Sequence, residues 1–200
     1  MAQLLLTRHG QSEYNLKNLF TGWLDVELTE KGKEEAKGAA LLIKETNIKL
    51  DHSFTSKLKR ANHTLDIILE ELNLVGKIPV VKNEAINERH YGDLQGKNKK
   101  EMAEKFGAEQ VHTWRRSFDT PPPGGESLKE TAERSIPYFQ SKIVPVLEEN
   151  KNVLVAAHGN SLRSIVMHIE KLSPAEIIKK EIKTGELWIY DYKDGNFEKI

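Results

Sequence analysis

The chain has 200 residues, and its thirty basic side chains balance thirty acidic ones. This length suits one globular domain with enough buried surface for its own core. The zero net charge argues against a protein that coats nucleic acid or binds a membrane through a basic face. The absence of cysteine excludes disulfide frameworks, cysteine-ligated metal sites and thiol nucleophiles.

The first part of the chain alternates short apolar runs with amphipathic helical patterns. Residues 4–7 are typical of a strand buried on both faces. A helix is predicted from Thr29, because apolar side chains follow at the spacing of one helix face at Ala36, Ala39, Ala40 and Ile43. Residues 52–55 are a weaker strand candidate. A second helical pattern begins at Lys59, and residues 78–81 indicate a further strand.

Residues 83–125 interrupt this alternation. The segment is polar, rich in Arg, Lys and Gly, and ends in a proline-glycine run at 121–125. We expect a short helix near 98–106 and otherwise irregular structure. Long irregular segments in compact domains are usually functional or disordered. Aromatic side chains argue against disorder here, namely Tyr91, Phe106, Trp114 and Phe118.

The rest of the chain returns to regular structure. Ser127 and Glu130 form a capping box that predicts a helix to about residue 149, which Pro137 and Pro145 should bend or interrupt. The following elements are a buried strand, a helix, a short helix after a second capping box, and a hairpin around a two-residue turn. They are predicted at residues 153–157, 161–172, 173–176, and 187–200 with the turn Asp194-Gly195.

The alternation of strands and helices predicts an α/β fold with a mainly parallel sheet. No linker or low-complexity stretch divides the chain, so we expect one domain over residues 1–200. No apolar run is long enough to cross a bilayer, and the N-terminus lacks the features of a secretory signal. A cytoplasmic protein that binds neither membranes nor nucleic acid is therefore expected.

One motif follows both of the clearly buried strands. The runs Arg8-His9-Gly10-Gln11-Ser12 and Ala157-His158-Gly159-Asn160-Ser161 share a histidine, a glycine, a polar residue and a serine in this order. Ligands of parallel sheets bind beyond the carboxyl ends of the strands, so the two histidines could face each other across one site. Glycines allow close approach of the backbone, and helix N-termini favour anions. Unrelated polar residues at two strand ends are the alternative, which the repetition weakens.

Basic residues are frequent on the predicted loops and helix starts. Arginine and lysine side chains there would suit a small polyanionic ligand, although Lys97 and Lys100 fit an exposed helix start better. Phosphate-loop, dinucleotide-binding and histidine-based metal motifs are absent, and we expect no metal. The paired histidines and the basic side chains that remain fit a site in which a histidine nucleophile transfers a phosphoryl group.

Further motifs extend over nearly the whole chain. They are Leu6-Thr7-Arg8-His9-Gly10-Gln11-Ser12-Glu13, Asn15, Phe20-Thr21-Gly22-Trp23, Leu28-Thr29-Glu30-Lys31-Gly32, Thr55-Ser56 with Arg60-Ala61, Asn87-Glu88-Arg89-His90-Tyr91-Gly92, Gln95-Gly96 with Asn98-Lys99, Trp114-Arg115-Arg116, Pro121-Pro122-Pro123, Glu126-Ser127-Leu128, Ala157-His158-Gly159-Asn160-Ser161-Leu162-Arg163 and Thr184-Gly185. On these motifs the chain resembles the histidine phosphatase superfamily, and within it the branch of cofactor-dependent phosphoglycerate mutases. The resemblance implies a three-layer α/β sandwich, in which helices flank a mainly parallel sheet and residues 83–125 cover the substrate.

The resemblance also implies a role for each matching residue. His9 would carry the phosphoryl group, Arg8, Arg60 and His158 would surround it, and Glu88 would be the general acid and base. The substrate-binding positions would be Arg8, His9, Gly10, Gln11, Ser12, Asn15, Thr21, Gly22, Arg60, Glu88, Arg89, His90, Tyr91, Lys99, Arg115, Arg116, Gly159 and Asn160. The implied reaction interconverts 3-phosphoglycerate and 2-phosphoglycerate in glycolysis and gluconeogenesis. The priming phosphoryl donor would be 2,3-bisphosphoglycerate, without a metal.

Two alternatives and two departures from the family pattern accompany this hypothesis. A phosphatase of the same superfamily would not need the distal set Tyr91, Lys99, Arg115 and Arg116, and a non-catalytic phospho-ligand binder would need no nucleophile. Only Gly124-Gly125 joins Pro123 to Glu126 where many relatives have a longer insert, which leaves both a homodimer and a monomer open. The chain also ends soon after the predicted hairpin, where relatives often carry a tail over the site.

The remaining histidines, His52, His63, His112 and His168, are expected to be structural or surface residues.

Overall fold

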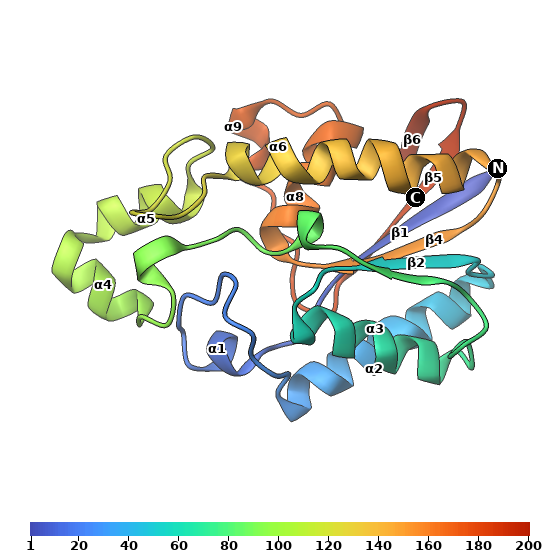
Figure 1. Ribbon diagram of the computed structural model, residues 1–200, viewed down its shortest axis with the longest axis horizontal. Coiled ribbons are helices and arrows are strands. Elements are labelled where there is room, and N and C mark those ends of the chain that lie inside the picture. The colour runs from blue at the N-terminus through green and yellow to red at the C-terminus, as the bar shows by residue number, and fades with distance from the viewer.

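A six-stranded sheet forms the centre of the computed structural model, which describes residues 1–200. The strand order is β3-β2-β4-β1-β5-β6, and the first four strands of this order are parallel (Figure 1). The last two strands add an antiparallel edge. The strands are β1 (Ala2–Arg8), β2 (His52–Thr55), β3 (Val80–Lys82), β4 (Val153–Ala157), β5 (Leu187–Lys193) and β6 (Asn196–Lys199). The prediction of a mainly parallel sheet is confirmed.

Helices cover both faces of this sheet (Figure 1). One face packs against α2 (Glu30–Thr46) and α3 (Lys59–Glu71), which bury their apolar sides on Leu5, Leu154 and Ala156. The other face contacts four further helices through the alternate side chains of β1 and β4, because successive residues of a strand point to opposite faces. These helices are α6 (Leu128–Tyr138), α7 (Val144–Glu148), α8 (Gly159–Ile169) and α9 (Pro174–Ile177). The predicted three-layer arrangement is confirmed.

The two prolines of the long helix interrupt it as predicted. Pro137 lies in the last turn of α6, and Pro145 lies in the first turn of α7. A π-turn, η3 (Phe139–Ile143), joins the two helices, because proline supplies no N–H for the regular ladder. Other boundaries differ by two residues from the prediction, since β3 begins later and α8 earlier. No helix combines the length and apolar character needed to cross a membrane.

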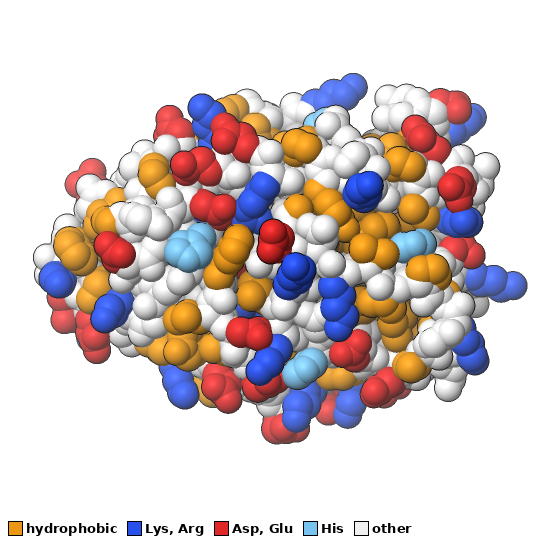
Figure 2. Space-filling model, in the orientation of Figure 1, with side chains coloured by type: hydrophobic (Ala, Val, Ile, Leu, Met, Phe, Trp, Pro, Cys, Tyr) orange, Lys and Arg blue, Asp and Glu red, His pale blue; other side chains and the backbone are white.

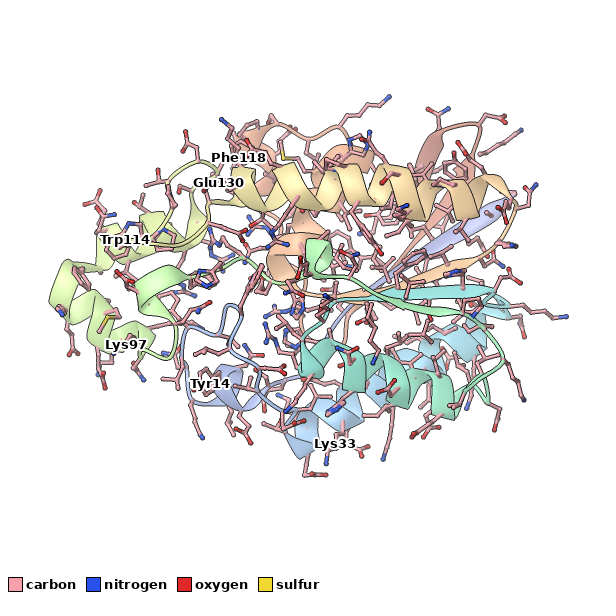
Figure 3. All side chains as sticks on the ribbon, viewed as in Figure 1. Tyr14, Lys33, Lys97, Trp114, Phe118 and Glu130 are labelled. Carbon is pink, nitrogen blue, oxygen red and sulfur yellow. The ribbon has the colours of Figure 1, made fainter.

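Residues 83–125 are more ordered than the sequence indicated. The expected helix is present as α4 (Lys99–Phe106), but a second helix, α5 (Ala108–Arg116), and two short turns, η1 (Glu84–Ile86) and η2 (Gly92–Leu94), were not predicted. The expectation of otherwise irregular structure is therefore wrong. Both helices pack around a small apolar cluster of Phe20, Leu94, Val111 and Trp114. They project from the sheet on the side where Lys97 and Trp114 are labelled in Figure 3, next to the short helix α1 (Glu13–Leu16).

Candidate active site

The two repeated motifs meet at the carboxyl ends of β1 and β4. Arg8 is opposite Ala157 in the parallel ladder, so the next residue of each strand, His9 and His158, emerges at the same sheet edge. The N–H of His9 continues the ladder by donating to Ala157 O at 3.0 Å. The ring centroids of the two histidines are 5.0 Å apart, and both rings are buried. The topology thus converts two distant motifs into one pair.

The surroundings of His9 fix both its tautomer and its charge. Its Nδ1 lies 2.7 Å from Gly10 O, which can only accept, so Nδ1 carries the hydrogen. Arg60 Nε donates to the opposite nitrogen, Nε2, at 3.3 Å. Burial, together with the charges of Arg60 and Arg8, lowers the pKa of His9 well below its ordinary value. His9 is therefore neutral at pH 7, and the lone pair of its Nε2 accepts the hydrogen bond from Arg60, which a phosphoryl group would have to displace.

Arg60 and His158 are the close neighbours of the His9 ring. Arg60 is 1% exposed, and its two terminal nitrogens donate to Gly22 O and Leu24 O, which aims its Nε at His9. Burial lowers the pKa of Arg60 to about 10, so the guanidinium remains charged at pH 7. Burial and Arg60 also lower the pKa of His158 well below its ordinary value. His158 Nε2 lies 2.8 Å from the hydroxyl of Ser56.

Glu88 enters the same pocket from the segment before α4. One carboxylate oxygen accepts hydrogen bonds from the N–H of Arg89 at 2.8 Å and from the N–H of Asn160 at 3.0 Å. The second of these donors lies in the first turn of α8, where the helix dipole favours a negative charge. Glu88 is 7% exposed. The second carboxylate oxygen has no protein partner, so it is available for proton exchange with a ligand.

The pocket has a strong local excess of positive charge. Two acidic side chains line it, Glu88 and Glu181, against six basic ones, namely Arg8, Arg60, Lys99, Arg115, Arg116 and Arg163. Over the face of the molecule in Figure 2, by contrast, acidic and basic side chains are intermixed. The remaining lining residues are His9, Asn15, Leu19, Phe20, Thr21, Gly22, Tyr91, Gly159, Asn160 and Ile182. Such a concave, cationic site suits a small polyanion.

The helices of the 83–125 segment supply three of the six basic residues of the pocket. Lys99 is the first residue of α4, and Arg115 and Arg116 lie in the last turn of α5 rather than in a loop as the sequence suggested. Burial and the neighbouring charges of Arg115 and Arg8 lower the pKa of Lys99 to about 8. Arg116 forms an ion pair with Glu181 at 3.7 Å.

Several residues predicted to bind substrate do not line the pocket but support it. Gly10 contacts the backbone of α2, Gln11 accepts from the hydroxyl of Thr29, and Ser12 caps α1 through a reciprocal hydrogen bond with Asn15. Arg89 is fully buried and donates to the Tyr91 hydroxyl and to Arg115 O, both at 2.9 Å. His90 packs edge-on against Trp23. His158 lies behind His9, which alone of the pair lines the pocket.

The predicted site residues omit five that line the pocket, namely Leu19, Phe20, Arg163, Glu181 and Ile182. Arg163 belongs to the second histidine motif, and its spacing three residues after Asn160 could have placed it on the same helix face. It donates to the side chain of Asn160 at 3.2 Å and to Ile177 O at 2.8 Å. Glu181 and Ile182 precede β5 without a local pattern, so only the tertiary structure brings them to the pocket. The histidines expected outside the site are absent from its lining, and Lys97 is exposed.

Comparison with known proteins places this geometry in a family. The model of the histidine phosphatase superfamily (branch 1) matches residues 4–199. A protein of Nitrobacter hamburgensis named 2,3-bisphosphoglycerate-dependent phosphoglycerate mutase is 59% identical over 187 residues, which cover 94% of this chain and 90% of that protein. A protein of the same name from Cytophaga hutchinsonii is 54% identical over 192 residues, which cover 96% and 88%.

Solved structures share the fold. Bacillus stearothermophilus YhfR has a TM-score of 0.87 at 24% identity and covers 100% of this chain and 95% of its own. A mycobacterial glucosyl-3-phosphoglycerate phosphatase, solved with VO3, has a TM-score of 0.84 at 27% identity, with coverage of 100% and 98%. The paired histidines at neighbouring strand ends and the match from residue 4 to residue 199 lead to one conclusion: the chain belongs to branch 1 of the histidine phosphatase superfamily.

Proposed function

We propose that the chain interconverts 3-phosphoglycerate and 2-phosphoglycerate through a phosphohistidine primed by 2,3-bisphosphoglycerate. The relatives that are more than half identical over most of the chain carry the name of this activity. The observation that carries the proposal is the neutral His9, whose Nε2 lone pair shares one pocket with Glu88 and with basic residues on α4 and α5. The reaction belongs to glycolysis and gluconeogenesis, and we infer a cytoplasmic enzyme on that ground.

The chemistry consists of three in-line phosphoryl transfers, namely one priming transfer and the two transfers of each catalytic cycle. In the first, His9 Nε2 attacks the phosphorus of 2,3-bisphosphoglycerate, the P–O ester bond breaks, and the leaving oxygen takes a proton from the Glu88 carboxyl. In the second, the free hydroxyl of 3-phosphoglycerate gives its proton to Glu88 and attacks the phosphohistidine, which breaks the N–P bond. The bisphosphoglycerate formed turns in the site, transfers its other phosphoryl group to His9 and leaves 2-phosphoglycerate.

The charged groups around His9 stabilise the transferring phosphoryl oxygens. Arg8 and Arg60 flank the histidine, and the first turn of α8 at Gly159 and Asn160 adds a helix N-terminus to the same side of the pocket. These groups are held in place before the reaction, so little reorganisation accompanies the change in charge. No step in this scheme calls for a metal ion, because arginine side chains and backbone dipoles supply the positive field.

The distal basic residues favour a mutase over a general phosphatase. Tyr91, Lys99, Arg115 and Arg116 line the pocket on the side of the 83–125 segment, where they would hold the carboxylate and the second phosphate of the substrate. We infer that residues 1–200 form one domain and that this segment of it covers the substrate. Exclusion of water by it would protect the phosphohistidine from hydrolysis.

The test combines three measurements on the same protein. Labelled 2,3-bisphosphoglycerate should transfer acid-labile phosphate to the wild type, and a coupled assay should show conversion of 3-phosphoglycerate that depends on the priming donor. Release of inorganic phosphate should be slow by comparison. His9→Asn should abolish labelling and conversion, whereas His63→Asn, on an exposed α3 position paired with Glu27, should retain both. Dominant phosphate release without conversion would support the phosphatase alternative instead.

A further inference from the structure

We propose that Arg134 is a positioning residue for Glu88, the general acid and base of the proposed function on which this inference rests. Arg134 lies on α6 and is not among the residues that line the pocket. Its side chain instead reaches the far side of the backbone that presents Glu88. Neither the family motifs nor the pocket lining includes it.

The guanidinium of Arg134 binds the backbone on both sides of the Glu88 Cα. Nη1 donates to Ala85 O at 2.9 Å and to Asn87 O at 3.0 Å, and Nη2 donates to Glu88 O at 2.9 Å. A longer contact joins Nη1 to Glu84 O at 3.3 Å. These carbonyls follow β3 and have no strand partner in the sheet. One side chain thus serves a run of four acceptors, of which Glu84 O also accepts from the N–H of Asn87, at 2.9 Å.

Glu126 binds both Arg134 and the backbone that follows Glu88. Arg134 makes a bidentate ion pair with it, from Nε to Oε1 at 2.9 Å and from Nη2 to Oε2 at 2.8 Å. Oε2 of Glu126 also accepts from the N–H of His90 at 2.8 Å. Although burial raises the pKa of Glu126, the hydrogen bonds from Arg134 and from the His90 backbone hold it below its ordinary value. The charged pair therefore fixes the chain before and after Glu88.

The Glu88 carbonyl oxygen has a second donor, Trp23 Nε1, at 2.6 Å, and the Arg134 guanidinium carbon lies 5.5 Å from the centre of the Trp23 ring. The carboxylate itself is held independently by the N–H groups of Arg89 and Asn160. Removal of Arg134 would therefore leave the carboxylate and its partners in place but loosen the backbone that aims it. A small displacement of a proton donor slows only steps that need the proton.

The test exploits the leaving group of the phosphoryl donor. Transfer to His9 from 2,3-bisphosphoglycerate expels an alkoxide that needs a proton, whereas transfer from p-nitrophenyl phosphate expels a stable phenolate that does not. We expect Arg134→Met to slow single-turnover labelling of His9 by the alkyl ester about 10- to 100-fold more than labelling by the aryl ester. The loss should lie in kcat rather than in KM. Arg134→Lys, which keeps the charge but not the planar set of donors, should be intermediate.

Controls separate positioning from folding. Lys129→Met changes an exposed residue of the same helix whose side chain makes no hydrogen bond or ion pair, and both donors should react as with the wild type. Glu126→Gln breaks the ion pair without altering Arg134 and should shift the ratio of the two rates in the same direction. In a Glu88→Gln background, Arg134→Met should add little to the loss with the alkyl ester, because the two residues act through one proton transfer.

The outcomes are distinct. Equal losses with both donors, full additivity with Glu88→Gln, or wild-type rates in Arg134→Met would each overturn the proposal. If the aryl ester labels the wild type poorly, the double-mutant cycle of Arg134→Met and Glu88→Gln, measured with the alkyl ester, decides between non-additive losses, which support the proposal, and additive losses, which overturn it. Failure of the wild type to label His9 with either donor would instead contradict the proposed function.

Discussion

At the residue scale, the site depends on charged neighbours that set protonation. Burial, together with Arg60 and Arg8, keeps His9 neutral, as a nucleophile requires, and the carbonyl of Gly10 holds the remaining hydrogen on Nδ1. The same surplus of positive charge acts on Lys99, whose pKa is lowered to about 8 by burial and by Arg115. A residue proposed to bind an anion therefore titrates near the physiological range.

The pH dependence of kcat/KM should reveal Lys99. Because its charged form binds the substrate and is lost as the pH rises through about 8, kcat/KM for phosphoglycerate should fall above that pH. Lys99→Arg keeps the charge at any accessible pH, so the alkaline limb should move upward by about two units or more in that variant, which is the gap between the ordinary pKa values of the two side chains. An alkaline limb identical in both proteins would assign it to another group.

At the element scale, the loop after β1 is seated directly on the start of α2. A Cβ on Gly10 would lie 2.0 Å from Gly32 O, and a Cβ on Gly32 would lie 2.1 Å from Gln11 O. The two backbones are therefore in contact, with no room for a side chain between them. Glu35 of the same helix accepts from Gln11 N–H at 2.7 Å. The position of His9 is thus tied to α2 through the residues that follow it.

The same substitution at two positions of α2 should have opposite effects. Gly32→Ala must push the helix and the His9 loop apart, and we expect a loss of about 1–3 kcal/mol in the free energy of unfolding together with a lower kcat. Gly38 has no atom within 4 Å of a built Cβ, so Gly38→Ala should raise stability by about 1 kcal/mol through helix propensity and leave kcat unchanged. Urea unfolding and turnover measure both. Equal stability changes would show that the contact at Gly32 relaxes freely.

The elements that the sequence predicted well are those with a clear apolar period or a capping residue. Thr29, Ser127 and Ser173 begin helices as expected, and the turn at Asp194-Gly195 joins β5 to β6. Helix α5 was missed because only Val111 and Trp114 of its residues are buried, which is too sparse to show a period. The contacts of Arg134 with backbone carbonyls leave no trace in the sequence at all. They depend on how α6 packs beside the segment before Glu88.

At the scale of the whole molecule, charge is balanced overall and concentrated locally. The pairing of the two histidines could be predicted, because the carboxyl ends of parallel strands lie at the same edge of a sheet. The approach of Arg163 and Glu181 could not, since α8 and the segment before β5 meet the pocket through tertiary packing. The folded state also holds two buried neutral histidines, which affects stability as well as chemistry.

Stability should decline in mild acid. His9 and His158 have a pKa well below the ordinary value in the folded state, whereas the unfolded chain binds protons near pH 6.5. The unfolded state therefore takes up more protons as the pH falls, and the free energy of unfolding decreases below that pH by about 1.4 kcal/mol per pH unit for each histidine. Urea unfolding between pH 7.5 and 5.5 would measure it, and His158→Asn should show about half the slope. A slope unaffected by that change would contradict the assignment.

The pocket draws its residues from two sets of elements. The groups proposed to make and break the P–N bond follow β1, β2 and β4, with Glu88 after β3, whereas the groups proposed to hold the far end of the ligand lie on α4 and α5. Exchange of α4 and α5 alone would then alter which phosphoester is accepted and leave the groups of the bond chemistry in place. Substrate identity and reactivity are thus separable traits of this chain, each able to diverge without the other.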